Sequence, residues 1–228
     1  ISSMDFPHLM TLSFKSILDG ITNYDLEPIQ HSLDLLESSQ GLRTSLERNI
    51  SDVEENMKHF EDLIRSLLLT LKAPQSLIKM EFFEEIFNYF THLLQFDNNL
   101  VTSMTIFTEH VFDNESFVRS PKALDFLCTF INYCGKIPLI EKIADVIIAS
   151  FNDDSTSVSN EQKISYLKII QALHLKGHLK NTHTNDTIDF VDKVMQPMPN
   201  LNFSEMEEGL IFLIVHLIKT LSVLSSDF

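Results

Sequence analysis

The sequence contains few of the residues on which tight turns and disulfides depend. Its 228 residues include five Gly, seven Pro and two Cys, and no Trp. All-β folds need many tight turns, which rely on Gly and Asn, so the low Gly content argues against that class. The two thiols, Cys128 and Cys134, are too few for a disulfide framework. Free core thiols are typical of a reducing compartment, and we therefore expect an intracellular protein, cytoplasmic or nuclear.

Motifs for cofactors and for catalysis are missing as well. The glycines are isolated along the chain, so they form no Gly-rich phosphate-binding loop. No Ser lies in the nucleophile elbow of a hydrolase, although Ser, His and Asp are plentiful enough for a site assembled from scattered residues. We expect a protein that is not an enzyme and uses no cofactor. An all-helical enzyme with an unrecognised site remains an alternative.

Basic residues are in short supply. The chain has 17 Lys and Arg against 32 Asp and Glu, which gives a formal net charge of −15. Broad nucleic-acid surfaces and anionic membranes both attract clustered positive charge, so we expect neither as a direct partner. The longest uninterrupted apolar run, Leu210–Val215, is also too short to span a bilayer. The acidic surface either aids solubility or attracts a partner with a basic face.

Apolar residues make up 44% of the chain and recur at helical spacing. Phe is unusually frequent at 18 residues, and its rings are expected to be buried because they carry apolar area without a polar atom. No segment shows the sustained period-two alternation that strands produce. The periodicity predicts helices over the ranges 6–18, 24–36, 51–72, 80–96, 100–112, 121–134, 139–151, 164–175, 187–195 and 204–224.

Several of these helices have start or stop signals. Ser120 followed by Pro121 is typical of a helix start, with Ser as the cap and Pro at the first helical position. Asn98 or Asn99 can cap the predicted helix 100–112. Gly177 is expected to end the predicted helix 164–175. Three segments fit the capping box, in which a Ser and a Glu or Gln three residues later cap each other's backbone amides: Ser51–Glu54, Ser159–Gln162 and Ser204–Glu207.

These patterns predict an all-α fold of about eight to ten antiparallel helices joined by short links. A closed four-helix bundle cannot absorb so many helices, whereas an open stack of helical pairs can. The pairs 51–72 with 80–96 and 121–134 with 138–151 resemble the paired amphipathic helices of HEAT- and armadillo-type α-solenoid proteins. The resemblance covers most of the chain as architecture, and no repeat consensus recurs at a fixed period of about 40 residues.

The resemblance implies an irregular HEAT-like α-solenoid in one helical-repeat domain over residues 1–228. The polar stretch 152–160 is a candidate sub-boundary within it. Because the chain begins at Ile1 rather than at Met, we expect it to be a fragment of a longer protein.

A stack of helices without a catalytic motif favours a scaffold or adaptor that binds other proteins within a larger assembly. A partner helix or a larger subunit would dock in a groove between helices. A few apolar contacts would supply the energy, and the acidic rim would guide the encounter. One alternative has the same fold but a different role. By fold-level analogy, the protein would be a regulatory helical-repeat subunit of a chromosome-maintenance, checkpoint-kinase or transport complex.

Three histidines, His174, His178 and His183, form the most suggestive cluster for metal binding. Two His four residues apart on one helix can share a metal ion. Gly177 is expected to end the helix between the first two, which would separate them, and the alternative is a set of ordinary loop histidines. We predict no metal site, and these three residues are the candidates should one exist.

A second cluster consists of Lys168, Lys176 and Lys180, a basic spot in an acidic protein that could contact an acidic peptide, a phosphate or a protein partner. Alternatively, a Lys near a helix C-terminus interacts favourably with the helix dipole.

Acidic residues on the predicted helix 51–72 are expected to form a solvated face, although paired carboxylates can also hold metal ions or transfer protons. These residues are Asp52, Glu54, Glu55, Glu61 and Asp62.

Overall fold

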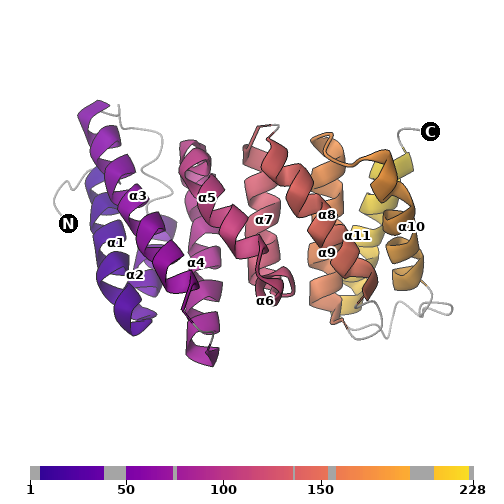
Figure 1. Cartoon of the computed structure of the whole chain (residues 1–228), viewed down its shortest axis with the longest axis horizontal. Helices are drawn as coiled ribbons and strands as arrows, with labels where there is room; N and C mark the ends of the chain where they lie inside the picture. Colours follow the sequence, from indigo (N-terminus) through magenta and orange to yellow (C-terminus); the bar gives the residue numbers. More distant parts are fainter. Residues whose placement is uncertain are drawn as a thin grey trace. The chain divides into compact units, whose positions relative to one another are not determined.

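In the computed structural model, every regular element is a helix within the residues that the structure describes, which are 6–38, 50–73, 76–135, 137–153, 158–195 and 208–225 (Figure 1). The predicted all-α class is therefore confirmed. The first elements are α1 (Phe6–Gly20), η1 (Ile21–Asn23), α2 (Glu27–Ser38), α3 (Ile50–Leu71), α4 (Leu77–Phe96), η3 (Asn98–Leu100) and α5 (Val101–Phe112). The next are α6 (Glu115–Val118), α7 (Pro121–Tyr133), α8 (Pro138–Asp153), α9 (Asn160–Leu175), α10 (Asn181–Met195) and α11 (Glu208–Ser225).

The chain divides into two compact units, Ile1–Asp113 and Asn114–Phe228. The first unit holds α1 to α5 and the second holds α6 to α11. The polar stretch 152–160 separates α8 from α9 inside the second unit, and its residues 154–157 lie outside the described ranges. The single helical-repeat domain over residues 1–228 stays a prediction.

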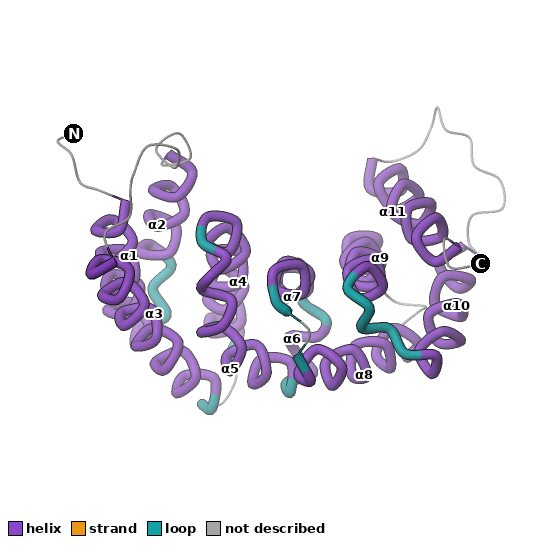
Figure 2. Tube along the Cα trace, turned by 90° about the horizontal axis from the view of Figure 1, so that it is seen from above, coloured by secondary structure: helices purple, strands orange, loops and turns teal. Residues whose placement is uncertain are grey.

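Alternate helices lie side by side within each unit. In the first unit α1 packs against α3, α2 against α4, and α3 against α5. In the second unit α7 packs against α9, α8 against α10, and α9 against α11, so that α9 lies between α7 and α11 (Figure 2). An internal helix such as α3 or α9 must therefore bury apolar side chains on two of its sides.

A chain of aromatic rings joins four helices of the first unit. The ring centroids of Phe14 on α1 and Phe60 on α3 are 5.1 Å apart. Phe60 is 5.7 Å from Phe90 on α4, and Phe90 is 5.2 Å from Phe107 on α5. All four side chains are fully buried, which confirms the predicted role of these rings. Edge-to-face and tilted pairs of this kind add to the free energy gained from burial alone.

The junction between α3 and α4 contains a fully buried lysine. Ser76 begins α4 by accepting a hydrogen bond from the backbone amide of Lys79. The Lys79 ammonium donates to the carbonyl oxygens of Leu71, at 3.2 Å, and Ala73, at 2.5 Å. Burial lowers the pKa of this amine. Lys79 thus satisfies carbonyl groups that the end of α3 leaves without intrahelical donors.

The helix caps match the sequence signals at some positions. Ser120 and Ser159 each cap a helix, with side chains that accept from the amides of Ala123 and Gln162. Gly177 has a φ of +70° and ends α9, as predicted.

Other predicted caps are wrong. Ser51 lies inside α3, which already includes Ile50, so Ser51 is not the residue that precedes the helix. Neither Asn98 nor Asn99 is a cap, because Asp97 accepts from the Asn99 amide and starts the short helix η3. The third capping box, Ser204–Glu207, lies outside the described residues.

Candidate protein-binding surfaces

The three histidines lie on different local structures. His174 belongs to the last turn of α9, His178 follows that helix, and His183 lies in the first turn of α10. The Gly177 amide donates to the His174 carbonyl, and the His178 amide donates to the Leu173 carbonyl at 2.8 Å. These two bonds form a Schellman motif, which reverses the chain direction between His174 and His178.

Both ring nitrogens of His183 have hydrogen-bond partners within the protein. Its Nδ1 accepts from the Lys180 amide at 3.2 Å, so the proton is on Nε2, which donates to Asp145 Oδ1 at 2.5 Å. The first contact caps the start of α10, and the second ties α10 to α8. Within the described ranges, no group of three or more His, Cys, Asp and Glu side chains could hold a metal ion. The geometry therefore gives His183 a role in joining helices.

Two of the three lysines in the predicted basic spot are paired with carboxylates of the same unit. Lys180 Nζ lies 3.5 Å from Glu141 and 3.7 Å from Asp145. Lys168 Nζ lies 3.4 Å from an oxygen of Asp125 on α7. Lys176 is exposed, and it has no ion pair in the described part of the chain. Much of the local positive charge is thus matched internally, and a partner contact at these lysines stays a prediction.

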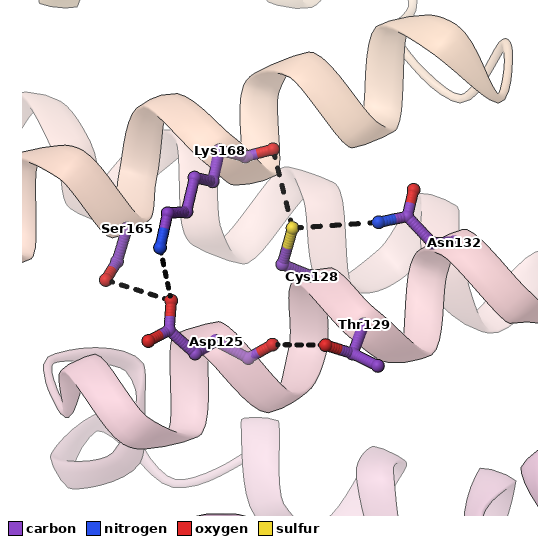
Figure 3. Close-up of polar contacts among 6 residues, drawn as sticks. All are labelled: Asp125, Cys128, Thr129, Asn132, Ser165 and Lys168. Atoms are coloured by element: carbon purple, nitrogen blue, oxygen red, sulfur yellow. Dashed lines mark hydrogen bonds and ion pairs between the residues drawn. The ribbon is translucent and has the colours of Figure 1, made fainter. Parts of the chain in front are cut away.

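The pair formed by Lys168 and Asp125 is part of a polar seam between α7 and α9 (Figure 3). Asp125 also accepts from the Ser165 hydroxyl at 3.5 Å, and the Cys128 thiol donates to the Lys168 carbonyl at 3.6 Å. Burial raises the pKa of Cys128 to about 11, against the lowering effect of Lys168. Cys134 also has its pKa raised to about 11 by burial. Both are free thiols, as predicted, and they stay protonated at neutral pH.

A groove lies between α3 and α5 in the first unit, with a volume of about 610 Å³. We call it the α3–α5 groove, and its lining residues are Glu61, Ile64, Arg65 and Leu68 from α3 with Thr102, Ser103, Thr105, Ile106 and Glu109 from α5. The side chains of Ile64 and Leu68 are buried and half-buried, whereas Ile106 is 51% exposed. The groove therefore combines an apolar floor with an acidic residue from each helix.

The acidic residues predicted for α3 divide between this groove and open solvent. Glu61 lines the groove, while Glu54 and Glu55 are exposed, as a solvated face requires. Asp62 accepts a hydrogen bond from Arg65 at 3.3 Å on the exposed surface. The side chain of Asp52 lies outside the described ones. Sequence periodicity did not single out the groove, because Ile106 belongs to the same apolar run as the buried Phe107.

Helix α11 has apolar residues both on the side that packs against α9 and on the opposite side. Leu213, Leu217 and Thr220 are buried, and α11 packs on α9, where Gln171 donates to the His216 carbonyl and the Thr220 hydroxyl. The opposite side is exposed at Ile211 (40%), Phe212 (52%), Val215 (40%) and Ile218 (61%). We call these four residues the α11 stripe. A smaller groove of about 210 Å³ adjoins α11, lined by Ile188, Val191, Asp192, Leu221, Leu224 and Ser225.

By length and apolar composition alone, α11 would be sufficient to cross a membrane. The short run Leu210–Val215 is part of this helix, whose apolar composition continues along its whole length. The expectation that no membrane is a partner stays a prediction. Only 17% of this apolar window is buried within the protein, and a single helix that passes by length and composition is weak evidence for a membrane span.

No protein-family model, curated protein or solved structure matches this chain. The resemblance to HEAT- and armadillo-type proteins therefore stays a prediction.

Proposed function

We propose that this protein is a non-enzymatic helical scaffold that binds an amphipathic segment of a partner protein in the α3–α5 groove. The observation that carries the proposal is the groove itself, whose lining residues include the apolar Ile64, Leu68 and Ile106 together with the carboxylates Glu61 and Glu109. In this proposal each unit is a segment of an irregular HEAT-like α-solenoid. The packing of alternate helices against each other supports that arrangement, because stacked helical pairs bury their faces against neighbours along the stack.

The geometry of the groove favours a helical ligand. Its α3 residues are spaced three and four apart, and so are most of its α5 residues, so a ridge of side chains from each helix borders it. An amphipathic helix places apolar side chains at the same spacing and can lay them between such ridges. Ile106 is the natural anchor, because half of its surface is still exposed and would be removed from water on binding.

The charge of the protein indicates which partner segments the groove would favour. The protein carries a net charge of −15, and an acidic residue from each helix lines the groove. A partner with Lys or Arg beside its apolar face would be attracted during encounter, whereas an acidic segment would be repelled. Arg65 is the cationic side chain among the lining residues, and its bond to Asp62 directs it toward an acidic neighbour on α3.

Binding can be measured by fluorescence anisotropy with two labelled helical peptides of about 15 residues. They share the same Leu positions, and one is flanked by Lys and Arg while the other is flanked by Glu. We expect the basic peptide to bind more tightly, with an affinity that falls as salt rises. Ile106→Glu should weaken its binding by about tenfold or more, because a charge would replace the apolar anchor.

Leu69→Glu is the matched control. Leu69 is 65% exposed on α3 and does not line the groove, so this variant should bind the basic peptide as the native protein does. Partners captured from a cell extract should be lost with Ile106→Glu and retained with Leu69→Glu. Equal binding of both peptides, or equal loss with both variants, would contradict the proposal.

A further inference from the structure

The α11 stripe has the spacing of a helix-pairing surface. Ile211, Val215 and Ile218 are four and three residues apart, which places them on one side of the helix. That side is opposite to the buried Leu213 and Leu217, which α11 presents toward α9. The hydrogen bonds from Gln171 to α11 fix the orientation of α11 about its own axis. The stripe is therefore an exposed apolar surface in a fixed orientation.

Two charged residues accompany the stripe, and they are the only ones in α11: Glu208 and Lys219. Both are exposed, and neither has an ion pair in the described part of the chain. They are eleven residues apart, so at 100° per residue they lie about 20° apart around the helix, between Phe212 and the row formed by Ile211, Val215 and Ile218. Along the axis they are separated by about 16 Å.

This arrangement is self-complementary for an antiparallel pair of helices. When two antiparallel helices are related by a two-fold axis between them, the same edge of each helix lies on the same side of the interface. Glu208 of one copy then faces Lys219 of the other, and the symmetry repeats the pair at the other end. A parallel pairing would instead bring like residues to the same level, without either ion pair.

We infer that the α11 stripe binds a second copy of this chain, antiparallel and around a two-fold axis. Ile211, Val215 and Ile218 would form the apolar centre, Phe212 would lie beyond the charged edge, and the two pairs between Glu208 and Lys219 would set the register. The groove between α10 and α11 continues the apolar surface through Ile188 and Leu221, which are 46% and 40% exposed. This inference goes beyond the proposed function, because the α3–α5 groove takes no part in it.

The first test is the oligomeric state of the full chain, measured by sedimentation velocity over a concentration series. We expect a reversible dimer that Ile218→Glu converts to monomer. Ile78→Glu is the matched control, since Ile78 is 63% exposed against 61% for Ile218 and lies in the first unit. Circular dichroism checks that each variant is folded. If Ile218→Glu loses its helical signal, Ile218→Ser replaces it in the comparison.

The second test is a charge exchange that leaves the apolar centre unchanged. Glu208→Lys and Lys219→Glu should each raise the dimer dissociation constant about tenfold or more, because each turns two attractive contacts into two repulsive ones. The double variant should return it to within about threefold of the native value. A parallel dimer, or one that uses another surface, would show no such rescue.

Three outcomes would overturn the inference. One is a native protein that stays monomeric throughout the concentration series. Another is a dimer that resists Ile218→Glu, and the third is a charge-exchanged double variant that does not recover. If the native monomer instead floats with neutral phosphatidylcholine vesicles and Ile218→Glu does not, the stripe contacts lipid and the dimer is wrong. Peptide binding in the α3–α5 groove should be unchanged by all α11 variants, so the two proposals can fail separately.

Discussion

At the scale of single residues, His216 links folding to pH. Its ring is half-buried on α11, and the described residues offer no hydrogen bond to its buried Nδ1. Burial, followed by the charges of Lys168 and Lys219, lowers the pKa of this imidazole, and Asp125 opposes them more weakly. The unfolded chain therefore takes up a proton at a higher pH than the folded protein does. The free energy of unfolding should fall as the pH drops from about 6.5 through the lower folded pKa.

Urea unfolding at several pH values between about 7.5 and 5 measures this effect. The native protein should lose more stability over this interval than His216→Gln, which has no group to protonate at that position. His110→Gln, at an exposed site on α5, should follow the native curve. Parallel curves for the native protein and His216→Gln would show that His216 contributes nothing to the acid sensitivity.

Single residues also show where sequence patterns stop being informative. Free thiols at Cys128 and Cys134 follow from their number and are confirmed. Lys79 gives no such signal, because a Lys near the start of an apolar helix is normally expected in solvent. Its burial depends on carbonyl groups at Leu71 and Ala73, whose position is set by where α3 ends. That information is tertiary and is not contained in the spacing of residues around position 79.

At the scale of an element, the end of α9 depends on Gly177. Its φ of +70° favours Gly, since a Cβ there crowds the backbone. We expect Gly177→Ala to reduce the free energy of unfolding by about 1 kcal/mol. Gly209→Ala is the comparison, because its added Cβ meets no atom within 4 Å and its backbone is helical. It should be neutral or slightly stabilising, and chemical denaturation of both variants would decide this. Similar losses at both positions would contradict the left-handed cap.

The boundaries of elements were predictable where the signal was local. The apolar run over 100–112 nearly coincides with α5, Val101–Phe112. The start of α10 was missed by six residues, because Asn181–Asp186 is polar and has no helical periodicity in its apolar residues. That start is held by the contacts of His183 with Lys180 and with Asp145 on α8, which is far away in the sequence. The bond to Asp145 joins residues 38 positions apart, and a local sequence pattern cannot reveal it.

At the scale of the whole molecule, sequence periodicity gives the fold class but not the working surfaces. Ile106 and Phe107 are neighbours in one apolar run, yet Ile106 is 51% exposed while Phe107 is fully buried. On α11, the buried Leu217 adjoins the exposed Ile218 in the same way. Because helices in this protein are apolar on more than one side, periodicity cannot separate the side chains of a core from those of an interface. The two candidate surfaces emerged only once the neighbours of each helix were known.

The net charge of −15 makes the stability of the whole molecule depend on salt. Like charges repel more strongly in the compact state than in the unfolded chain, and added salt screens that repulsion. The ion pairs of Lys168 with Asp125 and of Lys180 with Glu141 are partly exposed, so their loss to screening costs little. We therefore expect the free energy of unfolding to rise as NaCl increases from about 10 to about 200 mM. Urea unfolding at low protein concentration measures this, with KCl as the control for ion-specific effects. A decrease instead would mean that the ion pairs between helices outweigh the net repulsion.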